Sequence, residues 1–226
     1  MSETGFFGKV RTHGDFVARR LPAVFIEPWD RSVQAGMLEA RSRYGAQWLP
    51  LYLNAPVWCF ALGGTLCGDE AWAGVLMPGV DRVGRYFPFT LARPMAPASL
   101  ANWLRGAQAW FDAAVELALS TLAPSFDLER FDEQVRALDG VGEFEREGDA
   151  PWRYACVQEG ENPGVALGEC LATHAAAGAS IWWSEGSDAV AATLRVCAGL
   201  LDGPCFADLL DAAQAPWQAA IALRRA

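Results

Sequence analysis

The sequence is poor in the residues from which catalytic and metal sites are usually built. It has only two histidines, His13 and His174, and neither lies in a metal-binding spacing. None of its six cysteines forms a Cys-x-x-Cys pair, which disfavours a structural zinc site. Because the chain is long and hydrophobic and shows no export signal, we expect reduced, buried thiols rather than disulfides. No cofactor and no metal site is predicted.

Long hydrophobic runs are absent as well. No run approaches the roughly 18 residues that span a bilayer, because Gly or Pro interrupts the most apolar stretches. The basic residues near the start are not followed by the apolar core of a signal peptide. We therefore expect a cytoplasmic protein that does not insert into a membrane.

Apolar residues are abundant, and negative charge is concentrated in one half. Of the 226 residues, 52% are hydrophobic and 26 are Trp, Tyr or Phe, so the chain should fold around a large core.

The net charge is −9, with +2 over residues 1–113 and −11 over 114–226. An acidic protein is repelled by phosphate backbones, so nucleic acid is a poor candidate partner. The acidic half is either a solvated surface or a docking surface.

Period-two alternation and short apolar runs predict the strands. In chain order these cover residues 5–10, 15–20, 57–62, 72–77, 84–92, 154–158, 179–183 and 194–200. The runs at 57–62 and 72–77 are almost wholly apolar, as in central strands that are buried on both faces. Pro88 places the strand at 84–92 at a sheet edge or a bulge, because proline cannot donate to a neighbouring strand.

Apolar residues at steps of three or four predict the helices. These cover residues 25–44, 48–54, 99–122, 128–138, 164–177 and 206–213. Pro28 suits the first turn of the helix at 25–44, and Gly45 suits the position just past its end. The helix at 99–122 has the widest apolar face and stops before Pro124.

The order of these elements predicts an α+β fold, an α/β sandwich with a partly antiparallel central sheet flanked by helices and a smaller C-terminal α/β addition. We expect one domain over residues 1–226. The irregular, glycine-containing stretch at 139–151 is either a surface loop or the connection between two sub-lobes, 1–124 and 125–226.

No catalytic motif is complete. His13 and Asp15 lie in a predicted turn, where they form either a dyad or simply part of the turn. The nearest match to a Gly-x-Ser-x-Gly nucleophile motif, around Ser180, lacks the second glycine. A hydrolase that uses Cys67 or His13 is therefore the less favoured alternative to a protein without catalytic activity.

One polar cluster stands out at a predicted hairpin. Asp81, Arg82, Arg85 and Tyr86 lie within six residues, beside Gly84. Arginine and aromatic side chains are the types that dominate protein-binding hot spots. The cluster is therefore a candidate partner-binding surface, unless Asp81 and Arg85 pair with each other and only stabilise the hairpin.

Three blocks in the first 95 residues carry a resemblance to a known family. They comprise residues 5–9, 14–17 and 28–30, then Trp48, Tyr52, Pro56, Trp58 and Phe60, then 74–78 and 80–88. In combination they resemble the TagF family, accessory proteins of bacterial type VI secretion. The resemblance marks a structural set: Gly5, Gly8, Gly14, Asp15, Pro28, Trp29, Asp30, Trp58, Pro78, Gly84 and Pro88.

The resemblance implies a non-enzymatic, cytoplasmic, post-translational repressor of type VI secretion. Its implied partner is the forkhead-associated scaffold protein of that system, and the alternative is a structural or assembly component of the apparatus. The predicted N-terminal order of two strands, a helix, three strands and a long helix is also similar to a longin domain, a fold that binds partners on sheet edges and helix faces.

Overall fold

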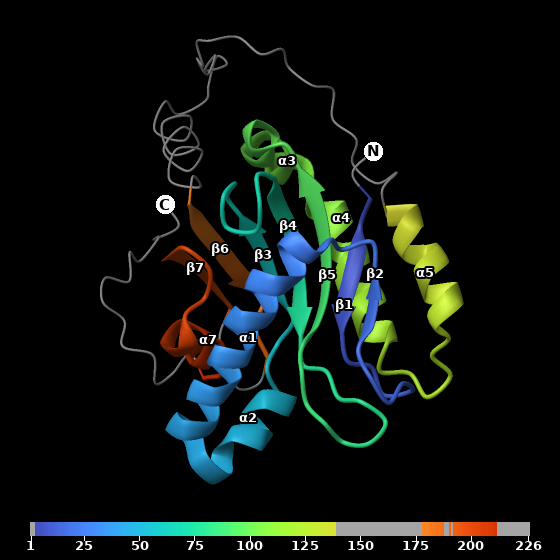
Figure 1. Ribbon diagram of the computed structural model, residues 1–226, viewed down its shortest axis with the longest axis vertical. Helices are drawn as coiled ribbons and strands as arrows, with labels where there is room; N and C mark the ends of the chain where they lie inside the picture. Colours follow the sequence, from blue (N-terminus) through green and yellow to red (C-terminus); the bar gives the residue numbers. More distant parts are fainter. Residues whose placement is uncertain (1–2, 139–177, 188–189, 191, 212–226) are drawn as a thin grey trace.

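The computed structural model describes residues 3–138, 178–187, 190 and 192–211, and these form an α+β sandwich (Figure 1). The strands are β1 (Gly5–Gly8), β2 (Val17–Arg19), β3 (Trp58–Leu62), β4 (Ala71–Met77), β5 (Phe89–Met95), β6 (Ala179–Ser184) and β7 (Thr193–Ala198). The α-helices are α1 (Ala23–Tyr44), α2 (Trp48–Leu53), α3 (Leu100–Gly106), α4 (Gln108–Ser120), α5 (Leu128–Ala137) and α7 (Gly203–Leu210), with short 3₁₀ turns at Gly45–Gln47 and Pro97–Ser99. None of the described helices is both long and apolar enough to cross a bilayer.

The seven strands of the described residues belong to one sheet in the order β2-β1-β5-β4-β3-β6-β7, and every pair is antiparallel. The predicted sheet is therefore confirmed. The first five strands, with α1 between β2 and β3, have the element order on which the similarity to a longin domain was based. Strands β6 and β7 extend the sheet from β3, so the C-terminal elements continue the same layer.

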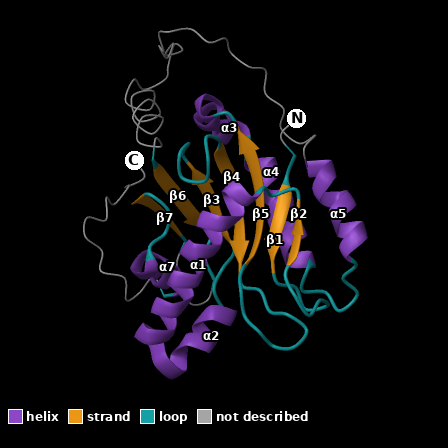
Figure 2. Ribbon diagram, viewed as in Figure 1, coloured by secondary structure: helices purple, strands orange, loops and turns teal. Residues whose placement is uncertain are grey.

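Helices cover both faces of this sheet and bury two separate cores (Figure 2). Large side chains of β3, including Trp58, Phe60 and Leu62, point toward the core under α1 and α7. The alternating residues Cys59 and Ala61 point toward the core under α3, α4 and α5. This alternation follows from the period of two in a strand, and it explains why β3 is apolar throughout.

Helix α1 is the main element of the first core. Phe25, Trp29, Val33, Met37 and Ala40 are all buried, so the predicted apolar stripe is confirmed. The Trp29 ring packs within 4.8 Å of Phe60 and 5.9 Å of Trp182, measured between ring centroids. Its indole Nε1 donates a hydrogen bond of 3.1 Å to Thr90 Oγ1, which satisfies its only polar atom.

Proline and glycine account for the differences from the predicted elements. Helix α1 begins at Ala23, so Pro28 lies beyond the first turn. The expected edge or bulge at Pro88 is wrong, because β5 begins at Phe89 and lies between β1 and β4. The single helix predicted over 99–122 is divided into α3 and α4 at Ala107, which has a non-helical ψ of 5°. Ala107 comes directly after Gly106, a poor helix former. The expected strand at 154–158 and the expected helix at 164–177 lie outside the described residues.

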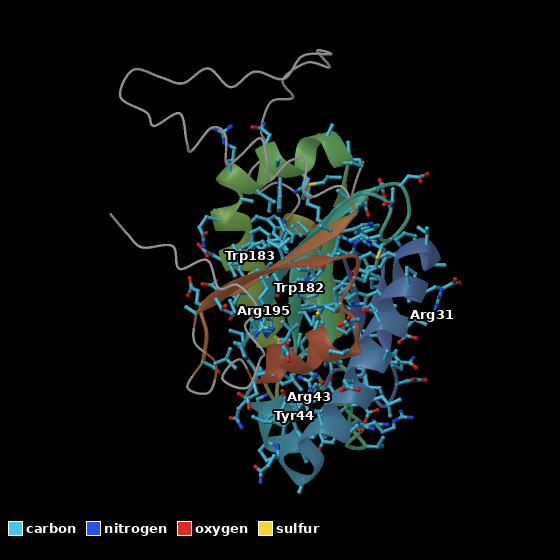
Figure 3. All side chains as sticks on the ribbon, turned by 90° about the vertical axis from the view of Figure 1, so that its left-hand side faces the viewer. Arg31, Arg43, Tyr44, Trp182, Trp183 and Arg195 are labelled. Carbon is cyan, nitrogen blue, oxygen red and sulfur yellow. The ribbon has the colours of Figure 1, made fainter. Side chains whose placement is uncertain are left out.

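Helix α7 packs along α1 through one close approach. A Cβ atom on Gly36 would lie 2.3 Å from Cγ of the Phe206 ring, so glycine leaves the space that the ring occupies. Polar contacts flank the ring: Arg43 and Asp208 are 2.6 Å apart, and Tyr44 Oη donates to the Ala207 carbonyl at 3.1 Å. Viewed from the β7 edge, Arg195 lies beside Trp182 on the side of α7, with Arg43 and Tyr44 nearby (Figure 3).

Replacement of Gly36 by Ala should destabilise the protein despite improving helix propensity. The propensity gain is about 1 kcal/mol, whereas overpacking against Phe206 costs about 1–3 kcal/mol. In a Phe206→Ala background the same change should be neutral or stabilising, because the ring is gone. Urea unfolding of the four proteins of this cycle measures both effects. Destabilisation by Gly36→Ala of equal size in both backgrounds would contradict the proposed steric contact.

Candidate functional site

The loop between β4 and β5 packs against the loop between β1 and β2. The hairpin loop, residues 78–88, is closed by a bridge between Val80 and Tyr86. Its Arg82 backbone N–H donates to the His13 carbonyl at 2.9 Å, and the Arg85 guanidinium donates to the Gly14 carbonyl. Two of the blocks that carried the family resemblance therefore meet at one end of the sheet.

Asp81 is the centre of this junction. Its carboxylate is fully buried and accepts hydrogen bonds from Lys9 Nζ at 2.7 Å, Arg85 Nε at 2.7 Å, Arg85 N at 2.8 Å and Val83 N at 3.0 Å. Burial alone would raise the pKa of Asp81, but the hydrogen bonds from Lys9, Arg85 and Val83 outweigh it, so the pKa lies below its ordinary value. A charged carboxylate with four donors is satisfied without water.

The cation paired with Asp81 is of a residue type that occurs once in the sequence. Lys9 is the only lysine in the sequence, and all other cations are arginines. Its side chain is buried, and its ammonium lies 4.9 Å from the centroid of the Phe16 ring. Phe16 in turn stacks on Phe7 at 5.2 Å and meets Phe87 edge-on at 4.9 Å. The Lys9 ammonium therefore lies against an aromatic cluster of Phe7, Phe16 and Phe87, which joins the two loops.

Helix α2 holds the other side of the hairpin. The Tyr52 hydroxyl donates to the Gly79 carbonyl at 3.0 Å and accepts from the Gly79 N–H at 2.9 Å. Tyr86 packs edge-on against Trp48 and Tyr52, with centroids 5.7 and 5.9 Å apart. Burial raises the pKa of Tyr52, so its hydroxyl stays protonated and keeps both hydrogen bonds.

Two glycines make the hairpin possible. Gly84 has a φ of 83°, in the left-handed region where side chains are disfavoured. A Cβ on Gly79 would lie 2.4 Å from the Phe87 carbonyl oxygen and 2.6 Å from the Lys9 carbonyl oxygen, so only glycine allows the loops to approach this closely. The backbone of the hairpin is thus fixed on both flanks.

The structure separates the four residues of the predicted binding cluster. Asp81 and Arg85 form the internal pair that was the alternative interpretation, and Tyr86 is half-buried against α2. Arg82 is exposed, and its guanidinium has no hydrogen bond or ion pair within the described part of the chain. A role in partner binding therefore stays a prediction for this cluster, and the geometry makes Arg82 its most available member.

The family-marked residues divide between this junction and the rest of the fold. Gly8, Gly14, Asp15, Pro78, Gly84 and Pro88 lie in or beside the two loops, whereas Gly5, Pro28, Trp29, Asp30 and Trp58 lie elsewhere. Trp58, for example, donates from Nε1 to the Leu209 carbonyl at 3.2 Å and so contacts α7. Asp30 accepts from Gln34 on the surface of α1 at 2.6 Å.

Sequence reasoning did not identify Lys9, Tyr52, Phe16 or Val83 as parts of this site. The signal available for Lys9 was that it is the only lysine of the chain and lies within the strand predicted over residues 5–10. All four residues fall in the blocks that carried the family resemblance, but nothing in the sequence shows that these blocks meet, because their contact comes from packing between distant segments. We define the hairpin surface as the exposed residues Arg11, Phe16, Arg82, Val83 and Arg85.

The groups proposed for hydrolysis are not arranged for catalysis. Cys67 is buried, and desolvation raises the pKa of its thiol to about 12. The Nδ1 atom of His13 lies 2.9 Å from Thr12 Oγ1, while the Asp15 carboxylate accepts from the Phe16 N–H at 2.8 Å. The His13 ring and the Asp15 carboxylate are therefore each bonded to a different neighbour and not to each other. Within the described residues, no cluster of three or more His, Cys, Asp or Glu side chains is placed to hold a metal ion.

Comparisons with known proteins give a consistent assignment. A family model described as the TagF N-terminal domain, type VI secretion system-associated, matches residues 5–138. The chain is also similar to the crystal structure of PA0076 from Pseudomonas aeruginosa PAO1, with 36% sequence identity, a TM-score of 0.80 and 99% of each chain covered. No curated relative matches the sequence.

Asp81→Asn should destabilise the protein, and the loss should depend on pH. The pKa of Asp81 is depressed in the folded state, so its stabilisation is present above the unfolded value of about 3.9 and is lost as pH falls toward the folded value. The difference in free energy of unfolding between wild type and variant should therefore be largest at pH 5–7 and narrow toward pH 3. Urea titrations across this range measure it, with the exposed Asp15→Asn as control. A difference that stays constant with pH would show that the Asp81 charge contributes nothing.

The thiol of Cys67 should resist alkylation until the protein unfolds. A pKa of about 12 leaves almost no thiolate at pH 8, and burial blocks access. A short pulse of iodoacetamide, followed by peptide mass spectrometry, should label Cys67 far more slowly in native protein than in urea. Native labelling of Cys67 at the rate of the unfolded chain would restore the hydrolase alternative.

Proposed function

The chain belongs to the TagF family of type VI secretion system-associated proteins, and from this membership we propose that it is a non-enzymatic negative regulator of that secretion system. It acts after translation, in the cytoplasm, by binding another protein. The proposed partner is the forkhead-associated scaffold of the secretion system, and binding sequesters or restrains it.

The observation that supports a binding role is the rigid hairpin surface. Asp81 fixes the hairpin to Lys9 on one flank, and Tyr52 fixes it to α2 on the other. Arg82 and Val83 therefore project from a backbone that is already ordered before any partner arrives. A preordered loop loses little conformational entropy on binding, and exposed arginine beside aromatic and aliphatic side chains is typical of binding hot spots.

The two other functions receive less support. A hydrolase needs a reactive nucleophile beside a base, whereas Cys67 is buried with a raised pKa and His13 is bonded to Thr12. A structural component of the apparatus would accumulate in the assembled machine at fixed stoichiometry. A regulator would instead associate with the scaffold outside the machine and lower secretion when its own amount rises.

Overproduction of the protein in its own bacterium should suppress type VI secretion without changing the amount of secretion proteins made. The secreted tube protein, measured in culture medium by immunoblot, should fall at least about tenfold while its cellular level stays constant. A tagged copy should retain the forkhead-associated scaffold in a pull-down read by mass spectrometry, against an unrelated tagged protein as control. Unchanged secretion together with no scaffold in the pull-down would overturn the proposed function.

A further inference from the structure

The hairpin surface is a basic region on an acidic protein. The two loops that form it, residues 9–16 and 78–88, carry four basic side chains and two acidic ones, a local charge of +2 when His13 is neutral. The whole chain carries −9. Both acidic groups are already engaged, since Asp81 is buried among its donors and Asp15 accepts from the Phe16 N–H. The field at this surface therefore attracts anions, whereas the chain as a whole repels them.

The arginines at this surface differ in how much of their charge is available. Arg85 is 56% exposed, but its guanidinium already donates to Asp81 and to the Gly14 carbonyl. Arg82 and Arg11 are exposed and have no acceptor among the described residues. Arg82 is also the better positioned of the two, because its backbone N–H is bonded to His13. Its guanidinium can therefore form a new pair without first breaking one.

Apolar groups lie beside these cations. Val83 is 65% exposed, and its N–H is held by the Asp81 carboxylate. Phe16 is 41% exposed, while the rest of its ring is fixed between Phe7 and Phe87. An exposed aromatic ring with a fixed orientation gives apolar contact area at little entropic cost. The surface thus offers separate contacts for a negative group and for a hydrophobic group.

We propose that the hairpin surface binds a short carboxylate-rich segment of a protein partner, with an Asp or Glu on Arg82 and an apolar side chain on Phe16 and Val83. This inference rests on the proposed function and specifies the chemistry of its contact. Long polyanions such as nucleic acid or an anionic membrane would extend past the two loops and meet the negative charge of the rest of the chain. A short segment is confined to the basic region, and its apolar side chain uses contacts that a phosphate backbone would leave empty.

The test measures fluorescence anisotropy of a labelled synthetic peptide in which Asp and Glu alternate with Leu and Phe. The comparison peptide has Asn and Gln at the acidic positions. The full-length protein is compared with Arg82→Glu, Arg82→Gln and Arg31→Glu, where Arg31 is an exposed residue of α1 outside the two loops (Figure 3). Arg82→Glu and Arg31→Glu change the net charge equally, so any difference between them is local.

Wild type should bind the acidic peptide, more weakly as salt rises, and should bind the neutral peptide at least about tenfold more weakly. Arg82→Glu should lose at least about tenfold in affinity, Arg82→Gln should lie between, and Arg31→Glu should stay within about twofold of wild type. Protection of Lys9 from amine acylation in each variant confirms that the two loops remain packed. The same affinity for both peptides, or equal loss in the two Glu variants, would overturn the proposal.

Two further results separate this inference from the proposed function. If the Arg82→Glu variant binds the scaffold with wild-type affinity, the carboxylate contact is overturned while the regulatory role stands. Absence of any scaffold complex overturns the regulatory role, whatever the peptide measurements give. Stronger binding of phosphatidylserine vesicles or of a single-stranded DNA oligonucleotide than of the acidic peptide would assign the surface to another class of ligand and overturn the proposal.

Discussion

A single buried ion pair determines the geometry of the candidate site. Lys9 and Asp81 are 72 positions apart in the chain, yet their buried side chains meet at 2.7 Å, with the Phe16 ring beside the Lys9 ammonium. A buried charge without its partner is strongly unfavourable, so neither loop can move away without exposing or orphaning one of these groups. The positions of Arg82, Val83 and Phe16 all follow from this pairing, because each belongs to one of the two loops that the pair joins.

The sheet supplies the rest of the rigidity. It lies between the two cores, because the large side chains of β3 point to one face and its small side chains to the other. Within the first core, Trp29 connects α1, β3 and β6. Helix α7 is attached to α1 by the fit of Phe206 against Gly36. The C-terminal elements thus stabilise the same helix that covers the N-terminal strands, although they lie beyond the residues matched by the family model.

Local patterns in the sequence were sufficient for much of the fold but not for the site. The strands at 58–62 and 71–77 and the helix at 23–44 were predicted almost to the residue, because continuous apolar runs and a stripe at helical spacing are local signals. The break at Ala107 was missed although Gly106, a poor helix former, precedes it, and the central place of β5 was missed because tertiary packing decides it. The cluster around Asp81 was found by composition, but its partner Lys9 was not, because a contact between distant segments leaves no periodic trace. Only the structure distinguishes the buried Asp81 from the exposed Arg82.

The scarcity of lysine has a consequence for how this surface is regulated. Because the only lysine is buried against Asp81, every exposed side-chain cation apart from histidine is an arginine. Arginine stays charged throughout the physiological pH range and is not a target of lysine acetylation, and its methylation preserves the charge. The positive charge of Arg11, Arg82 and Arg85 on the hairpin surface is therefore constant in the cell. Acetylation, which releases partners from lysine-rich surfaces by removing positive charge, therefore cannot act on these arginines.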